Sequence, residues 1–186
     1  MTELPLPKQR KLYFNKQVDQ ASIGDLTKEI IEINENDAFL KKLYSVYNLD
    51  YTPRPIEIYI DSYGGYVYQC FGLLSVMDNS KTPIHTIVTG CAMSCGFMIL
   101  ICGHKRFGHK LSTPLYHQVS SGTWGTLKDI KEDVKETERL QALLEKITLD
   151  RTKISKEKLA KVYKTKKDWF MSAEEALNLG VIDKII

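Results

Sequence analysis

The chain has 186 residues, of which 43% are hydrophobic and 26% are charged, and its formal net charge is +3. This length allows a proper hydrophobic core, and we expect one domain over residues 1–186. The composition is typical of a soluble globular protein, and so small a net charge gives no reason to expect nucleic-acid binding.

The N-terminal sequence, M-T-E-L-P-L-P-K-Q-R-K, has prolines and charges where a signal peptide needs an apolar core. We therefore expect a cytoplasmic protein. The uncharged run from Thr86 to Cys102 falls short of a membrane-spanning length and contains glycine, so we expect it to be buried in protein, with no membrane contact.

The four cysteines are Cys70, Cys91, Cys95 and Cys102. Without an export signal they are predicted to be free thiols in a reducing compartment. Cys91, Cys95, Cys102 and the nearby His104 are candidate metal ligands, but no C-x-x-C pair is present and free cysteine packs as a small hydrophobe. We therefore expect no metal and no cofactor.

The N-terminal third begins with a strand-like alternation over residues 10–15, R-K-L-Y-F-N. A helix is predicted from Ile23 to Ile33. Its apolar face consists of Ile23, Leu26, Ile30, Ile31 and Ile33. The tyrosine-rich segment from Asn34 to Pro55 is predicted to be a helix end or an excursion, closed by the breaker T-P-R-P.

A first strand and glycine turn follow. The β-branched run from Ile56 to Ile60 stops at D-S-Y-G-G, and a packed helix is predicted from Cys70 to Met77. Paired glycines after a strand let backbone amides approach a ligand at the carboxyl edge of a sheet, so Gly64 and Gly65 are candidate oxyanion donors. A simple strand-to-helix turn is the alternative.

A second strand, Pro83 to Val88, leads into T-G-C-A-M-S-C-G-F-M-I-L at residues 89–100. Ser94 lies among small residues at the predicted start of an apolar helix, where free N–H groups would hold a developing oxyanion. Taken alone, this composition favours a tightly packed core helix. His85 lies in mid-strand and is predicted to be packed or hydrogen-bonded.

The sequence H-K-R-F-G-H-K after Gly103 is predicted to be a basic turn, with His104 and His109 solvated. Leu115 to Val119 is predicted to be a strand before the loop S-S-G-T-W-G. His117 therefore lies at a strand end beside a glycine loop, a position typical of catalytic residues in α/β proteins.

Thr126 to Asp150 is predicted to be one long amphipathic helix whose other faces are densely charged. Its apolar stripe consists of Leu127, Ile130, Val134, Leu140, Leu144 and Ile147. Such a stripe fits contact with another subunit as readily as contact with the core.

The C-terminal part begins with a lysine-rich helical or loop segment from Lys153 to Lys167. Ser172 followed by Glu175 predicts a capping box and a short helix that stops at Gly180. Asp168 precedes this cap, and its simplest role is that of a turn carboxylate. An edge strand is predicted to contain Val181, Ile182 and Ile185.

Several motifs resemble one known family when they are taken in order. They are S-Y-G-G, G-C-A-M-S-C-G, Y-H-Q, and D-W-F-M-S-A-E-E-A with G-V-I-D. From about Arg10 to Ile185 the chain resembles the Clp protease proteolytic subunits (ClpP). The resemblance implies an α/β fold of the ClpP/crotonase type, with repeated β-β-α units and a protruding handle helix.

The resemblance also implies a serine endopeptidase that uses acyl-enzyme chemistry. Its nucleophile would be Ser94, its base His117 and its orienting acid Asp168, a set in which the imidazole activates the hydroxyl and the carboxylate fixes the tautomer. The backbone N–H groups of Gly65 and Cys95 would be the oxyanion donors, which leaves the Cys95 side chain free to vary.

The assembly implied by the resemblance is a pair of stacked heptameric rings, a tetradecamer around a closed chamber. The helix from Thr126 to Asp150 would be the handle that joins the rings. Small peptides would diffuse in, whereas unfolded proteins would be delivered by a separate AAA+ unfoldase, because the chain has no P-loop motif.

The chain departs from the family pattern at several positions. Tyr63 replaces the usual proline, which we expect to reshape the oxyanion turn, and Met93 is bulkier than the usual residue before the serine. The segment from Asn34 to Pro55 looks longer than in the family, and both termini look short. Family members use their N-terminal loops to meet a ring-shaped unfoldase, so the short termini put recognition of the usual unfoldase in question.

Two other functions are considered. A ring subunit with weakened chemistry would keep the architecture in a structural or regulatory role. A crotonase-type acyl-CoA enzyme would share the glycine turn but would leave Ser94, His117 and Asp168 unexplained.

Overall fold

The computed structural model of the chain describes residues 8–186. Most of the N-terminal sequence behind the expectation of a cytoplasmic protein lies outside these residues. Within 8–186, no helix is long and apolar enough to cross a membrane.

Within the described residues, seven strands form one sheet in the order β1-β2-β3-β4-β7, and β5 and β6 continue it beside β3. The strands are β1 (Lys11–Phe14), β2 (Ile56–Ser62), β3 (Ile84–Met93), β4 (Lys105–Gly108), β5 (Thr113–Tyr116), β6 (Trp169–Phe170) and β7 (Lys184–Ile185). Neighbours are parallel except for the antiparallel pair β5 and β6. Parallel strands need crossover connections, which the helices supply here.

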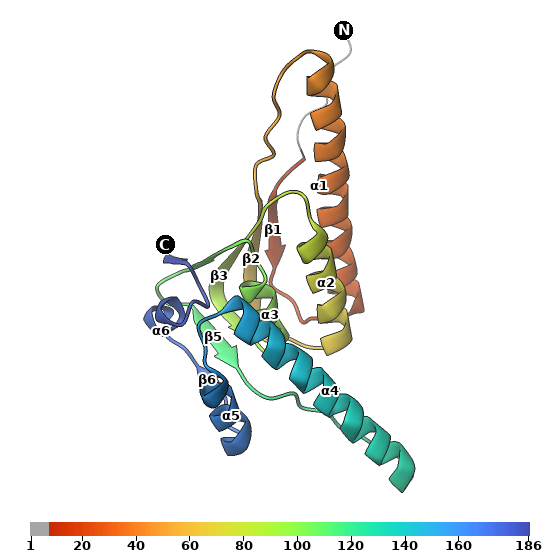
Figure 1. Ribbon diagram of the computed structural model, residues 1–186, viewed down its shortest axis with the longest axis vertical. Coiled ribbons are helices and arrows are strands. Elements are labelled where there is room, and N and C mark those ends of the chain that lie inside the picture. The colour runs from red at the N-terminus through yellow and green to blue at the C-terminus, as the bar shows by residue number, and fades with distance from the viewer. Residues whose placement is uncertain (1–7) are drawn as a thin grey trace.

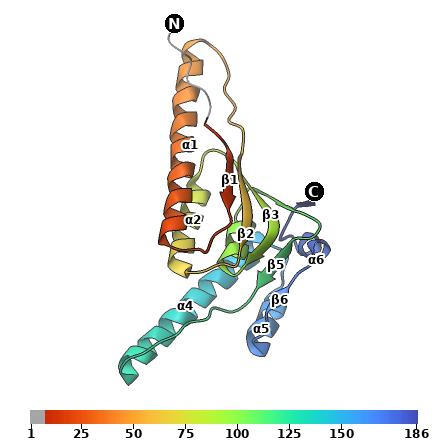
Figure 2. The same ribbon diagram turned by 180° about the vertical axis from the view of Figure 1, so that it is seen from behind.

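The helices are α1 (Gln20–Val46), α2 (Val67–Asn79), α3 (Cys95–Ile101), α4 (Leu127–Arg151), α5 (Lys156–Thr165) and α6 (Ala173–Asn178). α1 and α2 lie side by side on one face of the sheet, and α4 projects away from the body (Figures 1 and 2). One buried apolar cluster joins the sheet to these helices, and it includes Ile30, Ile58, Leu73, Phe97 and Leu100.

α1 is longer than the sequence predicts, because it continues through the tyrosine-rich segment as far as Val46. Its start is fixed by a capping box, in which Asp19 accepts from the Ser22 amide at 2.8 Å and Ser22 accepts from the Asp19 amide at 3.1 Å. Beyond Leu40 the helix is largely exposed, and it stands above the sheet in Figure 1.

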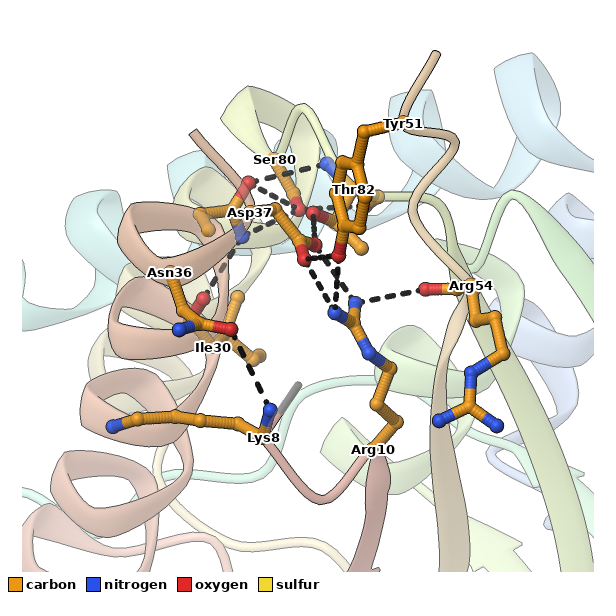
Figure 3. A network of polar contacts seen from close by, with 10 residues as sticks. Lys8, Arg10, Ile30, Asn36, Asp37, Tyr51, Arg54, Ser80 and Thr82 are labelled. Carbon is orange, nitrogen blue, oxygen red and sulfur yellow. Dashed lines mark hydrogen bonds and ion pairs between the residues drawn. The ribbon is translucent and has the colours of Figure 1, made fainter. Parts of the chain in front are cut away.

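A buried ion pair ties this extended helix to the rest of the molecule (Figure 3). The Arg10 guanidinium donates to both carboxylate oxygens of Asp37, and both side chains are only 6% exposed. Tyr51 and Thr82 each donate a hydroxyl hydrogen bond to the same carboxylate at 2.6 Å. Arg10 also donates to the Arg54 carbonyl at 2.9 Å, so the residue before β1, the helix α1 and the chain returning to β2 meet at one ion pair.

The predicted basic turn at residues 104–109 is wrong, because β4 runs through it between β3 and β7. The charges concealed this strand. Lys105 stays exposed, while Arg106 donates to the Asp183 carboxylate at 2.6 Å. Of the predicted edge strand only Lys184–Ile185 forms, since Val181 and Ile182 are buried in the preceding turn.

The predicted capping box at Ser172 and the predicted apolar stripe of α4 are each confirmed in part. Ser172 accepts from the Glu175 amide at 3.1 Å, but the Glu175 carboxylate accepts from the Trp169 indole instead of closing a capping box. In α4, Leu140 and Leu144 are buried against the body. The projecting end of the stripe is solvated, with Leu127 70% exposed.

Candidate active site

Ser94 stands at the junction between β3 and α3 in an unusual backbone conformation. Its φ of 53° and ψ of −119° are rare for a residue with a side chain and cost about 1–3 kcal/mol. The Ser94 amide donates to the Leu115 carbonyl at 3.1 Å, and its carbonyl accepts from the Met98 amide at 3.2 Å. The hydroxyl does not cap α3, so its oxygen is left available for chemistry.

The glycine turn after β2 packs directly against this junction. Gly64 has a φ of +95°, and a Cβ there would lie 2.6 Å from the Met93 carbonyl oxygen and 2.9 Å from the Cys95 nitrogen. Only glycine fits so close an approach. Tyr63 is 80% exposed, and it lines a second cavity together with Gly64 and Gly65.

Val18 holds this turn from its other side. Its amide donates to the Gly64 carbonyl, and its carbonyl accepts from the Tyr66 amide, both at 2.8 Å. In a trans peptide the C=O and N–H point in opposite directions, so the Gly65 N–H is directed away from Val18 and takes part in neither bond.

The strand register brings His117 and Asp168 together. β5 and β6 pair Leu115 with Phe170 and Tyr116 with Trp169, so the next residues on the two strands are His117 and Asp168. The His117 Nδ1 lies 3.3 Å from an Asp168 carboxylate oxygen. This contact favours the tautomer that carries its proton on Nδ1 and leaves Nε2 free to accept one. Asp168 is 56% exposed, so water screens the pair.

A cavity of about 50 Å³ joins most of the predicted site residues. Those that line it are Gly65, Ser94, Cys95 and His117. Asp168 does not line the cavity, but it contacts His117. Among residues 8–186, no hydrogen bond joins the Ser94 hydroxyl to His117. Contacts of this kind are often loose in unliganded enzymes and tighten when substrate binds.

The pocket also has lining residues that the sequence analysis did not assign to a site. Val67 of α2, Met98 of α3 and Leu144 of α4 are apolar residues that line it. Their helical spacing is the same as that of core residues, so periodicity gave no signal for them. Val18 acts through its backbone hydrogen bonds, which do not depend on the type of side chain and therefore cannot be recognised from the sequence.

His85 and the cysteines have structural surroundings, whereas the side chains of His104 and His109 are exposed, as predicted. His85 packs against Phe107 with ring centroids 5.6 Å apart, as predicted, and His104 accepts a hydrogen bond from the Ile84 amide. All the cysteines are free and buried, and burial raises the pKa of Cys91 and of Cys102 to about 11. Within the part of the chain described, no group of three His, Cys, Asp or Glu residues is placed to hold a metal ion.

Comparison with known proteins gives a match to the Clp protease family over residues 6–186. The chain belongs to the Clp protease family. It is 30% identical over 180 residues to the ATP-dependent Clp protease proteolytic subunit 2 of Treponema pallidum, covering 94% of this chain and 86% of that protein. It is 36% identical over 137 residues to the ATP-dependent Clp protease proteolytic subunit of Deinococcus radiodurans, covering 72% and 65%.

These matches confirm the predicted family, the α/β fold of the ClpP type and a Clp-type serine peptidase subunit. The crotonase-type alternative is therefore set aside.

Proposed function

We propose that Ser94, His117 and Asp168 form the catalytic triad of this peptidase. The observation that carries the proposal is the β5–β6 register, with the His117 imidazole 3.3 Å from Asp168. The pocket that His117 and Ser94 both line supports it as well. The strained backbone of Ser94 supports it, since strain of this kind gathers at functional sites.

In the proposed reaction, Ser94 Oγ attacks the carbonyl carbon of the scissile peptide bond while His117 Nε2 takes its proton. The tetrahedral intermediate then collapses, and His117 passes that proton to the leaving amine. A water molecule hydrolyses the acyl-enzyme by the same steps. Asp168 holds the imidazole in position and stabilises its charged form.

The amides of Gly65 and Cys95 are the proposed oxyanion donors. The Gly65 N–H is directed away from Val18, and Cys95 opens α3, where the first N–H groups have no intrahelical partner. A donor of this kind contributes roughly 10²–10³ to the rate.

Hydrolysis of a fluorogenic peptide tests this assignment. Ser94→Ala and His117→Ala are expected to lose the activity while keeping the wild-type melting temperature. Activity that survives in Ser94→Ala would refute the triad, and an inactive wild-type protein would favour the alternative of a ring subunit with weakened chemistry.

We also propose that the chain works as a single peptidase domain in a tetradecamer of stacked heptameric rings, with α4 as the handle between them. The solvated apolar residues on the projecting end of α4 support this assembly, as does its extension from the body in Figure 1. Light scattering tests it, and a monomer at micromolar concentration would contradict it.

The substrates we propose are peptides and unfolded proteins, the latter delivered by an ATP-dependent AAA+ unfoldase. The relatives' names, ATP-dependent Clp protease proteolytic subunit, support this partner. Degradation of an unfolded protein that is stimulated by ATP and an added unfoldase is the expected result. The cytoplasmic location expected from the sequence stays a prediction.

A further inference from the structure

The side chain of Cys95 makes a contact that the sequence did not predict. It is 2% exposed, and its Sγ donates to the Gly65 carbonyl oxygen at 3.2 Å. The Cys95 carbonyl in turn accepts from the Sγ of Cys70, in α2, at 3.6 Å. The thiol thus links the start of α3 directly to the glycine turn.

This link acts on a residue whose backbone has unusual freedom, because glycine populates positive φ as readily as negative φ. The peptide before Gly65 is fixed by the bond from Val18 to the Gly64 carbonyl. The peptide after it is fixed at both ends. Its N–H, that of Tyr66, donates to Val18, and its C=O accepts from Cys95. Both dihedral angles of Gly65 are therefore determined by its neighbours.

We propose that the Cys95 thiol is a positioning residue of this peptidase, which ties the two oxyanion donors, its own amide and that of Gly65, into one rigid unit. The proposal rests on the proposed function. The thiol neither attacks substrate nor transfers a proton to it. It sets the direction of the Gly65 peptide and so the alignment of the donors with the developing oxyanion.

The size of the effect follows from the remaining anchors. Loss of the thiol leaves the bonds to Val18 in place, so the turn is loosened and not released. We expect Cys95→Ala to lower kcat about two- to twelvefold, the range of one neutral hydrogen bond, well below the roughly 10²–10³ for losing a whole donor.

The test compares Cys95→Ala with Cys95→Ser, which keeps a donor of similar size. For each variant we would measure kcat and KM on a fluorogenic peptide and Ki for a peptide aldehyde, whose adduct with serine places an oxyanion among the donors. In Cys95→Ala we expect kcat to fall and the aldehyde Ki to rise by the same factor while KM stays constant. Cys95→Ser is expected to restore both.

Cys102→Ala is the matched control, since it removes a buried thiol from the other end of the same helix. It is expected to keep the wild-type ratio of aldehyde Ki to KM. If Cys95→Ala does not fold, Cys95→Val and Cys95→Thr replace the pair, because they differ by one hydroxyl donor.

Wild-type kcat and Ki in Cys95→Ala, or equal losses in Cys95→Ala and Cys95→Ser, would overturn the role of the thiol alone. A wild-type protein that neither cleaves peptide nor binds aldehyde would overturn the proposed function, and the role of Cys95 with it.

Discussion

Gly64→Ala is expected either to destabilise the protein or to slow catalysis, because the added methyl group has no space beside Ser94. Its carbon would lie 2.6 Å from the Met93 carbonyl oxygen and 2.7 Å from the Ser94 Cβ, closer than the 3.0 Å that real Cβ atoms respect. The φ of +95° costs alanine about 1–3 kcal/mol, and overpacking costs typically 1–3 kcal/mol more.

The protein can respond to this clash in two ways. If the turn stays in place, the free energy of unfolding falls by about 2–6 kcal/mol. If the turn moves by about 1 Å to relieve the clash, the oxyanion donors are misplaced and kcat falls by roughly 10². Either response is visible when peptide hydrolysis and thermal unfolding are measured on the same preparation.

Gly72→Ala in α2 is the matched control. Apart from its chain neighbours and the backbone of its own helix, no atom lies within 4 Å of the Cβ it would add. This variant is therefore expected to stay active and to gain about 0.8–1 kcal/mol of stability from helix propensity. Full activity and an unchanged melting temperature in Gly64→Ala would refute the close contact between the glycine turn and Ser94.

Two further predictions concern carboxylates. Asp37→Ala leaves Arg10 buried without its partner, so we expect chemical denaturation to show a loss of about 3–5 kcal/mol. Burial opposes the charged form of Asp37, but the hydrogen bonds from Arg10, Thr82 and Tyr51 hold its pKa below the ordinary 3.8. The stabilisation by Asp37 is therefore present at neutral pH and is lost as the pH falls below 3.8 towards the folded-state pKa. A difference in the free energy of unfolding between wild type and Asp37→Ala that stayed constant down to pH ~2 would contradict this expectation. Asp168→Asn is expected to lower kcat by up to ~10⁴ with little change in KM, since it removes the carboxylate that selects the His117 tautomer, and an unchanged kcat in steady-state hydrolysis would contradict the pairing.

The sequence predicted those site residues that follow clear strands. Ser94 and His117 each come after a β-branched or apolar run, and Gly65 belongs to a glycine pair after another. Asp168 is different, because β6 has only two residues and gives no periodic signal. The resemblance to a family supplied it, and the structure supplied the antiparallel register that brings it to His117.

The features that the sequence missed depend on long-range pairing. β4 did not look like a strand because two of its residues are charged. The strand tolerates them because Lys105 is exposed and Arg106 pairs with Asp183, which lies far along the chain. The full length of α1 was concealed by Asp37, a charged residue whose burial makes sense only beside Arg10. The link from Cys95 to Gly65 joins residues 30 positions apart, which no local pattern reveals.

The central claim, that Ser94 is the nucleophile activated by His117, is tested most directly by labelling the intact protein with a fluorophosphonate and locating the adduct by mass spectrometry. We predict one adduct, on Ser94, that is lost in His117→Ala while the variant stays folded. No adduct, or one that forms on Cys95 in a manner dependent on His117, would contradict the assignment.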